Sequence, residues 1–282
     1  MTFKPAKRFV KDRLRSLNRL YARRLHPFDA AQLGAALRGL GIAPGDVVMV
    51  HSAYDAFRGF AGKPTDVLAV LEDAVGPGGT LLMPSLPFTG TAVDYVRSGA
   101  VTDLARTPSR MGLLSELFRR QKGTLRSAHP THPVLTRGAR AEELVAGHET
   151  ARSPCGAGSP FAKLLEADGK ILFLGVSIDS MTFFHFLEEH FEDRLRPSPF
   201  TGETFDAPVR RGGETVTVRT RLFDPALSRR RDIGVMLPEL RRLGGLREAK
   251  VGLVPLLLVR AASARDAFAA ALDKGKSFYG RE

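Results

Sequence analysis

Short apolar runs alternate along the chain with segments in which hydrophobic and polar positions follow a helical period. Four runs are continuous and bounded by turn-forming or charged residues: residues 45–53, 80–88, 170–177 and 251–259. Runs of this length, rich in Val, Leu and Ile, are typical of strands that are buried on both faces of a sheet. We therefore predict that these four segments form the core of a sheet.

Between the runs, hydrophobic residues recur every three or four positions, which predicts helices. The predicted helices cover residues 30–41, 65–76, 107–123, 158–169, 180–193, 229–245 and 262–275. Asp29 is the predicted cap of the first helix, and Pro64 and Thr65 are predicted to begin the second. Either Thr107 or Ser109 is expected near the cap of the third. The sequence VGPGGT after the second helix is interpreted as a tight turn into the next strand.

Helices that alternate with short buried strands indicate an α/β fold, here a three-layer sandwich around a mixed, central sheet. Residues 197–225 depart from this alternation. Their first half, PSPFTGETFDAP, is rich in Pro, Gly and Thr, and ETVTVRTRLF alternates as a half-exposed strand does. We predict that they form a small β insertion or arm in the C-terminal third.

The N-terminal segment is basic and amphipathic. Residues 4–25 contain nine Lys and Arg against one Asp, with apolar residues at helical spacing. We predict a basic helix over residues 1–28 and a single domain over residues 29–282. Packing on the body is the interpretation we favour, and a weak contact with a membrane surface is the alternative. Nucleic acid is not expected as a partner, because the segment lacks the motifs of nucleic-acid readers.

Composition limits the class of protein. The chain has 282 residues, 43% of them hydrophobic and 26% charged, as in soluble globular proteins. No apolar run is long enough to span a bilayer and no secretory signal is evident, so a cytoplasmic location is expected. Cys155 is the only cysteine, which excludes an internal disulfide. The net charge of +12 creates a field that attracts anions and repels polycations.

Two stretches place polar side chains where ligands gather in α/β folds. His51 and Ser52 lie at the carboxyl end of the first predicted strand. The stretch RSAHPTHP contains Arg126, Ser127 and His129, and its prolines favour a rigid, extended loop that could aim an imidazole or a hydroxyl. For each stretch a purely structural role is equally compatible with the sequence.

The sequence TFFHFLEEHF, residues 182–191, combines histidine and glutamate among aromatic residues. On a helix His185 and Glu188 share a face, whereas His185 and His190 are about 140° apart and cannot bind one ion. We therefore expect no metal site. A carboxylate beside an imidazole orients the ring and raises its basicity, which suits a general base. The alternative is a helix with its polar residues, such as Glu189, turned outward.

Nothing in the chain signals a covalent nucleophile. The G-x-S-x-G elbow is absent, and Cys155 lies in a predicted loop without an obvious partner. A base without a nucleophile favours direct transfer of a group to a substrate that attacks for itself, such as an amine.

Several stretches together resemble the aminoglycoside 3-N-acetyltransferase family. They are HSAYDAF, VGPGGTLLMPS, TPSRMGLLSELFRRQKG, RSAHPTHPVLTRG and GSPFAKLLEADGKILFLGVSIDSMTFFHFLEE, in the family's order and spacing from about residue 30 to 260. The resemblance implies an acetyl-CoA-dependent N-acetyltransferase with an α/β fold of its own, unrelated to the GNAT fold. Acetyl-CoA is therefore the expected co-substrate, and the spacing of the histidines gives no reason to expect a metal cofactor.

The resemblance also assigns residues to the site. His185 and Glu188 match the family's active-site histidine and glutamate, Asp179 matches an acidic position upstream, and we expect these three to be catalytic. Acetyl-CoA is expected to contact the residues His51, Ser52, Ser109, Arg110, Met111, Gly112, Arg126, Ser127 and His129. The amine acceptor is expected to contact Tyr54, Thr182 and Glu189. Backbone N–H groups near Ser52 are expected to stabilise the oxyanion.

Two features depart from the family pattern. His132 and Pro133 stand where the family commonly has hydroxyl residues. The charge of +12 also opposes the capture of polycationic aminoglycosides while it favours CoA. The predicted reaction is acetyl transfer to a primary amine of an aminoglycoside, at the 3-N position, or of a related amino sugar.

The sequence leaves alternatives open. One is an acetyltransferase for a nucleotide-linked amino sugar in biosynthesis, and the other is a basic, non-catalytic protein that binds nucleic acid or a membrane. A homodimer is compatible with the sequence but is not predicted by any motif.

Overall fold

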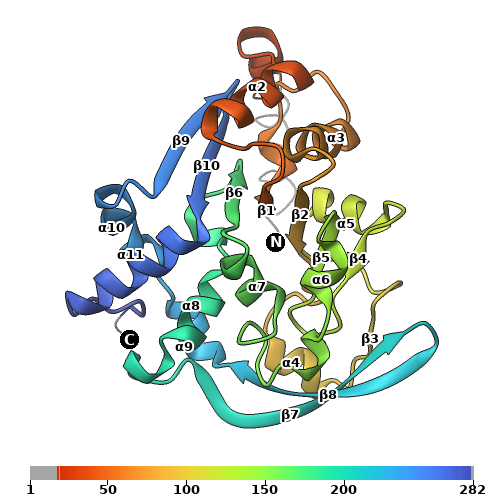
Figure 1. Cartoon of the computed structure of the whole chain (residues 1–282), viewed down its shortest axis with the longest axis vertical. Coiled ribbons are helices and arrows are strands. Elements are labelled where there is room, and N and C mark those ends of the chain that lie inside the picture. The colour runs from red at the N-terminus through yellow and green to blue at the C-terminus, as the bar shows by residue number, and fades with distance from the viewer. Residues whose placement is uncertain (1–17, 19, 281–282) are drawn as a thin grey trace, which may run out of the picture.

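A seven-stranded mixed sheet forms the centre of the protein in the computed structural model, which describes residue 18 and residues 20–280 (Figure 1). The strand order is β4-β5-β2-β1-β6-β10-β9. The strands are β1 (Val47–Ser52), β2 (Thr80–Pro84), β4 (Leu125–Arg126), β5 (Val134–Gly138), β6 (Lys170–Leu174), β9 (Leu246–Val251) and β10 (Val254–Arg260). The central strand β1 pairs in parallel with β2 and β6, and the outer pairs are antiparallel.

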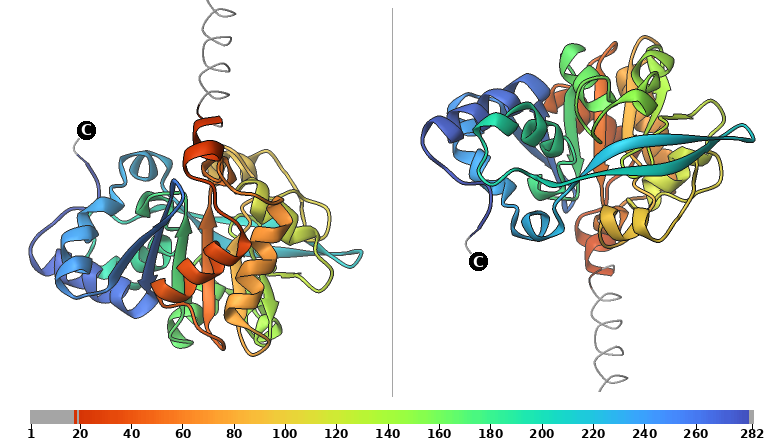
Figure 2. Two further views of the ribbon diagram at one scale, coloured as in Figure 1. Left: turned by 90° about the horizontal axis from the view of Figure 1, so that it is seen from above. Right: turned by 90° about the horizontal axis from the view of Figure 1, so that it is seen from below.

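Two hydrophobic layers cover the sheet because its central strands are apolar on both faces. On one face, Val48 and Val50 of β1 pack with α2 (Ala30–Leu40), α3 (Pro64–Val75) and α5 (Leu113–Arg120). On the other, Val47 and Met49 pack with the elements α6 (Ala141–Val145), α7 (Pro160–Glu166), α8 (Phe184–His190), α10 (Leu237–Arg242) and α11 (Ala261–Asp273). The predicted three-layer α/β fold is confirmed (Figure 2).

A second sheet lies beside the first. It has three strands in the order β3-β7-β8, where β3 spans Thr102–Asp103, β7 Phe200–Arg211 and β8 Glu214–Phe223. The β7–β8 hairpin reaches away from the main sheet and is the predicted β insertion (Figure 2). Gly212 and Gly213 form its two-residue turn with φ values of 58° and 99°, a conformation that glycine adopts without strain.

The first helix begins as predicted. The side chain of Asp29 accepts a hydrogen bond from the backbone of Gln32 at 2.8 Å, and the side chain of Gln32 accepts one from the backbone of Asp29 at 3.0 Å. This reciprocal pair is a capping box. The second helix begins at Pro64 and ends before Gly76, and the following turn joins it to β2 as predicted.

Four predicted elements differ from the structure. The helix expected over 229–245 is the end of α9 (Pro225–Arg230), a 3-10 turn over Ile233–Met236 and α10, because the backbone is extended at Arg231 and Asp232. The helix expected over residues 107–123 is only Leu113–Arg120, and its N-cap is Gly112, because the backbone N–H of Ser109 is held by Glu116 instead of starting the helix. The helix expected over 180–193 is three shorter pieces, with α8 in the middle. The run at 251–259, expected to be one strand, contains the end of β9, a turn and most of β10. The remainder of β9 was not predicted because its sequence, LREAKV, is largely polar.

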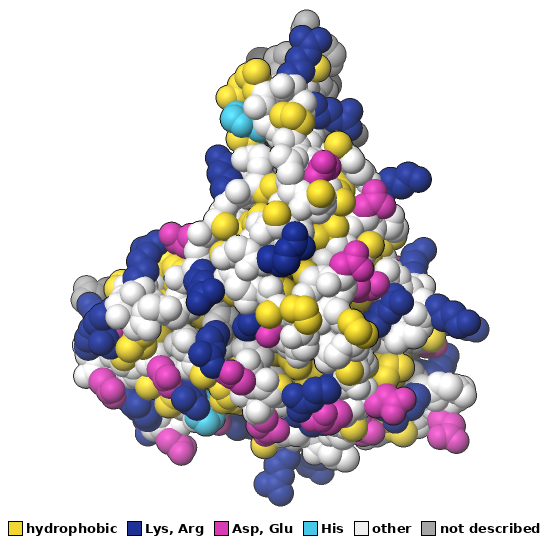
Figure 3. All heavy atoms as spheres, turned by 45° about the horizontal axis from the view of Figure 1, so that its top comes forward, with side chains coloured by type: hydrophobic (Ala, Val, Ile, Leu, Met, Phe, Trp, Pro, Cys, Tyr) yellow, Lys and Arg dark blue, Asp and Glu magenta, His cyan; other side chains and the backbone are white. Residues whose placement is uncertain are grey.

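The predicted N-terminal helix lies mostly outside the described residues. Of the described part, residues 20–25 are helical. None of the helices in residues 20–280 is both long and apolar enough to cross a membrane. On the face in Figure 3, Lys and Arg side chains are scattered among Asp and Glu side chains, so the basic composition does not form one continuous patch there.

Candidate functional site

A cavity of about 310 Å³ opens at the carboxyl ends of β1 and β2. Its walls bring together predicted residues from three separate stretches: His51, Ser52, Met111, Asp179, Thr182 and His185. Because β1 is parallel to its two neighbours, the loops that follow all three strands meet at this edge. The cavity is therefore the candidate active site.

The centre of the site is an imidazole–carboxylate pair on α8. His185 Nδ1 lies 3.1 Å from Oε2 of Glu188, three residues further along the helix. Glu188 is fully buried, while the side chain of His185 is 18% exposed. If Nδ1 carries the proton donated to the carboxylate, Nε2 is left as an acceptor. The pair therefore holds the ring in the tautomer that a general base needs.

Two further side chains fix Glu188. Arg231 donates from Nε to Oε1 at 3.0 Å and lies 2.9 Å from Oε2, and the hydroxyl of Tyr279 donates to Oε1 at 2.7 Å. Both partners come from distant parts of the chain, and the side chain of Arg231 is only 12% exposed. Glu188 is thus a buried carboxylate with every oxygen engaged.

These contacts determine the charge states of Glu188 and His185. Burial would raise the pKa of Glu188, but the hydrogen bond with His185 and the charge of Arg231 outweigh it and leave this pKa below its usual value. Burial lowers the pKa of His185, and the charge of Arg231 lowers it further against the opposing effect of Glu188. At neutral pH the pair is therefore a neutral imidazole beside an ionised carboxylate.

His51, the second imidazole of the cavity, has a different environment. Its ring stacks on Phe173 at a centroid distance of 5.2 Å, and its buried Nε2 has no hydrogen-bond partner within the described residues. Burial lowers the pKa of His51 to about 3. Without a carboxylate, this histidine stays neutral and lacks the support of a general base.

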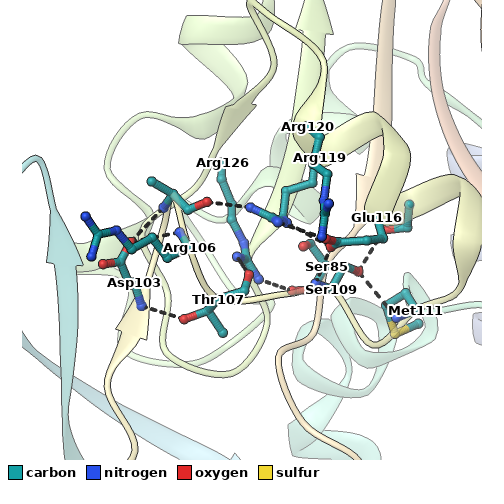
Figure 4. A network of polar contacts seen from close by, with 12 residues as sticks. Ser85, Asp103, Arg106, Thr107, Ser109, Met111, Glu116, Arg119, Arg120 and Arg126 are labelled. Atoms are coloured by element: carbon teal, nitrogen blue, oxygen red, sulfur yellow. Dashed lines mark hydrogen bonds and ion pairs between the residues drawn. The ribbon is translucent and has the colours of Figure 1, made fainter.

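The loop before α5 reaches the cavity through Met111, whereas Ser109, Arg110 and Gly112 do not line it. Ser109 Oγ lies 2.8 Å from Ser115 Oγ, and its backbone N–H donates to Glu116 (Figure 4). The backbone N–H of Arg110 donates to Leu86, and Gly112 has a φ of 109°. Hydrogen bonds from Arg119 lower the pKa of Glu116 to about 2, so an ionised carboxylate anchors this loop.

Arg126 lies behind the same loop. Its guanidinium donates to the carbonyl oxygens of Thr107 and Ser85, both at 2.6 Å (Figure 4). Burial lowers the pKa of Arg126 to about 10. The side chain ties the loop to the end of β2 and does not line the cavity.

Ser127 and His129 belong to a buried group of histidines. Ser127 Oγ lies 2.8 Å from Nδ1 of His148, and His129 Nε2 lies 3.2 Å from Thr220 Oγ1. The rings of His148 and His129 stack at 4.7 Å. Burial, followed by the effect of neighbouring histidines, holds the pKa of His129 well below its usual value. The structure therefore places both predicted residues inside the protein, away from the cavity walls.

A second cavity, also of about 310 Å³, adjoins the first at His185. It shares Leu86, His185 and Arg231 with the first. Its other walls include Phe88, Thr91, His132, Phe223, Ser228 and Arg229. The base candidate is therefore exposed to two adjoining cavities.

Two predicted acceptor contacts lie elsewhere. Tyr54 stacks on Phe57 and lines neither cavity. Glu189 faces a third cavity, where it accepts a hydrogen bond from the backbone of Cys155 at 2.8 Å and contacts the hydroxyl of Ser153. Thr182, the third predicted contact, does line the first cavity.

Sequence reasoning missed Arg231 and Tyr279. They lie 43 and 91 residues from Glu188 in sequence, and no local pattern points to them. Within the described chain, no group of three or more His, Cys, Asp and Glu side chains is arranged to hold a metal ion.

Comparison with known proteins gives a consistent match. A family model described as aminoglycoside 3-N-acetyltransferase matches residues 49–273. Aminoglycoside N(3)-acetyltransferase VIII of Streptomyces fradiae is 30% identical over 76% of this chain and 77% of its own length. Aminoglycoside N(3)-acetyltransferase IV of Salmonella sp is 35% identical, over 56% of this chain and 58% of its own length. The match thus spans little more than half of the latter relative.

Solved structures extend the match to the fold. Aminoglycoside acetyltransferase AAC(3)-Xa has a TM-score of 0.75 at 27% identity, covering 95% of this chain and 100% of its own. A binary complex of AAC-IIIb with CoASH has a TM-score of 0.72 at 29% identity, covering 90% of this chain and 98% of its own. AAC(3)-IVa in complex with gentamicin has a TM-score of 0.70 at 28% identity, covering 88% of each chain.

Proposed function

Because the chain belongs to the aminoglycoside 3-N-acetyltransferase family, we propose that it transfers an acetyl group from acetyl-CoA to a primary amine of an aminoglycoside or related amino sugar. The observation that carries the proposal is the position of His185 between two cavities. Direct transfer requires the thioester and the amine to meet at one base. His185 is the supported imidazole that both cavities reach.

We assign the first cavity to the thioester end of acetyl-CoA. Ser52 and Met111 line it, and Met111 belongs to the loop 109–112. A related enzyme of similar fold binds CoASH, which supports this assignment. Ser109, Arg110 and Gly112 lie in the same loop, and Arg126 holds that loop in place.

The reaction follows from the supported imidazole. The amine nitrogen attacks the thioester carbonyl carbon while Nε2 of His185 removes a proton from that nitrogen. The imidazolium that forms lies against the ionised Glu188, which stabilises it. When the C–S bond breaks, the thiolate of CoA takes the proton from His185. Asp179 lines the first cavity, where its carboxylate accepts a hydrogen bond from the hydroxyl of Ser177 at 2.8 Å.

The tetrahedral intermediate needs a donor for its oxyanion. The backbone N–H of Ala53 is already used, because it donates to Leu174 at 3.0 Å. The hydroxyl of Ser52 lines the cavity and has no hydrogen-bond partner within the described residues. Ser52 is therefore the better candidate, in a role worth roughly 3 kcal/mol in enzymes of similar design.

A covalent intermediate is not part of the proposal. Cys155 is buried, and burial followed by the charge of Glu189 raises its pKa well above the usual value. Such a thiol is a poor nucleophile.

Release of free CoA thiol from acetyl-CoA tests the proposal, with gentamicin, apramycin and amino sugars as acceptors. His185→Ala is expected to lower kcat by about 10² to 10⁴ with little change in the KM for acetyl-CoA. His190→Ala is the matched control, because His190 lies on the same helix but lines the third cavity. It is expected to keep normal turnover.

Two results would contradict this assignment. A rise in the KM for acetyl-CoA as large as the loss of kcat would make His185 a binding residue. Failure of the wild-type protein to bind acetyl-CoA would reject the proposed function as a whole.

A further inference from the structure

The second cavity carries hydrogen-bond donors and positive charge where a site for a polycation would need carboxylates. Arg229 and Arg231 line it, together with the hydroxyl of Ser228, and no Asp or Glu of the described chain does. Thr91 also lines it, but its hydroxyl already donates to Asp94. An ammonium group needs acceptors and negative charge, whereas an anion needs donors and positive charge.

Carboxylates on the neighbouring elements are already engaged. Glu188 is held by Arg231 and Tyr279. Asp224 accepts hydrogen bonds from the backbone at the start of α9 (Pro225–Arg230), and Asp94 accepts the hydroxyl proton of Thr91 at 2.6 Å. Arg231 compensates the charge of Glu188. Asp94 and Asp224 keep their charge but do not line the cavity, so no carboxylate of the described chain is placed to contact a polycation there.

Unlike these carboxylates, the side chain of Arg229 is not engaged by another described residue. No ion pair or hydrogen bond joins it to another described residue, and its side chain is exposed at the cavity wall. The charge of Arg231 is matched by Glu188, so Arg229 supplies the uncompensated charge of this cavity.

His132 adds a buried donor. It is 3% exposed, and its Nδ1 lies 2.9 Å from the hydroxyl of Thr131. The Nε2 atom makes no hydrogen bond within the described residues, although the ring lines the cavity at 5.3 Å from the ring of His185. Burial, followed by the effect of His185, holds its pKa well below the usual value, so the ring is neutral. If the Thr131 hydroxyl donates to Nδ1, the proton on Nε2 is available to a ligand oxygen.

We infer that the second cavity selects an amine whose other end is anionic, a phosphate or a carboxylate, which Arg229 and His132 bind while the amine faces His185. This inference rests on the proposed function, because it assigns the acceptor to the second cavity. It departs from gentamicin, the polycation present in the AAC(3)-IVa complex named above. The net charge of +12 acts in the same direction, since it favours the approach of an anion.

Calorimetric binding to the full chain loaded with CoA tests the inference, with glucosamine 6-phosphate, glucosamine and gentamicin as probes. Glucosamine 6-phosphate is expected to bind at least tenfold more tightly than glucosamine and gentamicin. Arg229→Glu is expected to remove that preference and to strengthen gentamicin binding. Arg219→Glu changes the net charge equally, on the exposed β arm, and is expected to preserve the preference.

The acid group is identified by a further probe, 2-amino-2-deoxyglucuronic acid, which carries a carboxylate at the position of the phosphate-bearing C6 of glucosamine 6-phosphate. Tighter binding of either anionic probe that depends on Arg229 supports the inference. Equal binding of charged and neutral probes, a preference that survives Arg229→Glu, tighter binding of gentamicin, or no binding of any probe would overturn it. Binding of CoA is measured in the same samples, so loss of the donor site, which rejects the proposed function, is recognised separately.

Discussion

Two neighbouring glutamates on α8 show how strongly position on a helix decides the chemistry of a carboxyl group. Glu188 and Glu189 are adjacent in sequence, and burial acts on both. Glu188 faces Arg231, Tyr279 and His185. Glu189 faces a separate cavity, with the backbone N–H of Cys155 and the hydroxyl of Ser153 as its partners.

The pKa values of the two carboxyl groups move in opposite directions. The charge of Arg231 and the hydrogen bond with His185 overcome burial and keep the pKa of Glu188 low. Burial raises the pKa of Glu189 to about 8, because its neutral partners only partly oppose it. One carboxyl is therefore an anion that supports a base, and the other is an uncharged acid near neutral pH. A one-residue step turns the helix by about 100°, which is enough to separate these roles.

The two substitutions to glutamine should give very different results. Glu188→Gln leaves the charge of Arg231 buried without an anionic partner, which is expected to lower the free energy of unfolding by about 4 kcal/mol. It also removes the charge that stabilises the imidazolium, so kcat should fall by roughly 100-fold. Urea denaturation and CoA release at pH 7 measure the two effects, with Glu189→Gln as the control. Equal stability of the two variants would show that the ion pair between Glu188 and Arg231 does not stabilise the fold.

The pH dependence of stability separates the same two groups. Between pH 4.5 and about 8 folded Glu189 keeps a proton that the unfolded chain releases, so this residue's contribution to stability falls as pH rises. The slope is about 1.4 kcal/mol per pH unit. Glu188 acts in the opposite sense: its lowered pKa gives a contribution that is present above pH 4.5 and is lost in acid.

Glu189→Gln should therefore become more stable relative to the wild type as pH rises. The difference in the free energy of unfolding is expected to grow by about 3 kcal/mol between pH 5.5 and 7.5. Urea titrations at these two pH values measure it. Glu166→Gln, in the wall of the same cavity but exposed, should show no such growth. A constant difference for Glu189→Gln would mean that Glu189 is ionised in the folded protein.

Local patterns predicted the parts of this arrangement that depend on local structure. The core strands β1, β2 and β6 were predictable because burial on both faces leaves a continuous apolar run. The pairing of His185 with Glu188 was predictable because a spacing of three residues places both on one helix face. The loop 107–112 was mistaken for helix because Thr107 and Ser109 are residue types that cap helices, whereas a side chain from the following helix, Glu116, holds its backbone.

Contacts between distant segments determine the parts of the site that local patterns did not predict. Arg231 and Tyr279 reach Glu188 only after the chain has folded, so their role left no mark on any short stretch. The family resemblance led us to expect that Glu189, next to the predicted catalytic pair, contacts the acceptor. The cavity it faces depends on the packing of residues 153–157 against α8, which the helical pattern does not encode.

The smallest expected effects come from removing one hydroxyl group beside each of the two glutamates. Tyr279→Phe removes the donor to Glu188 but keeps the buried ring, and it is expected to cost about 2 kcal/mol of stability, because hydrogen bonds to charged groups are the stronger class. Ser153→Ala removes the hydroxyl at Glu189 and should cost about 1 kcal/mol at pH 6, where that carboxyl is neutral. Turnover should change less than tenfold in both variants, since the bond between His185 and Glu188 remains. Urea denaturation at pH 6 and pH 9 measures the two costs. The cost of Ser153→Ala should rise towards that of Tyr279→Phe at pH 9, where Glu189 ionises; equal costs already at pH 6 would mean that the two carboxyl groups carry the same charge.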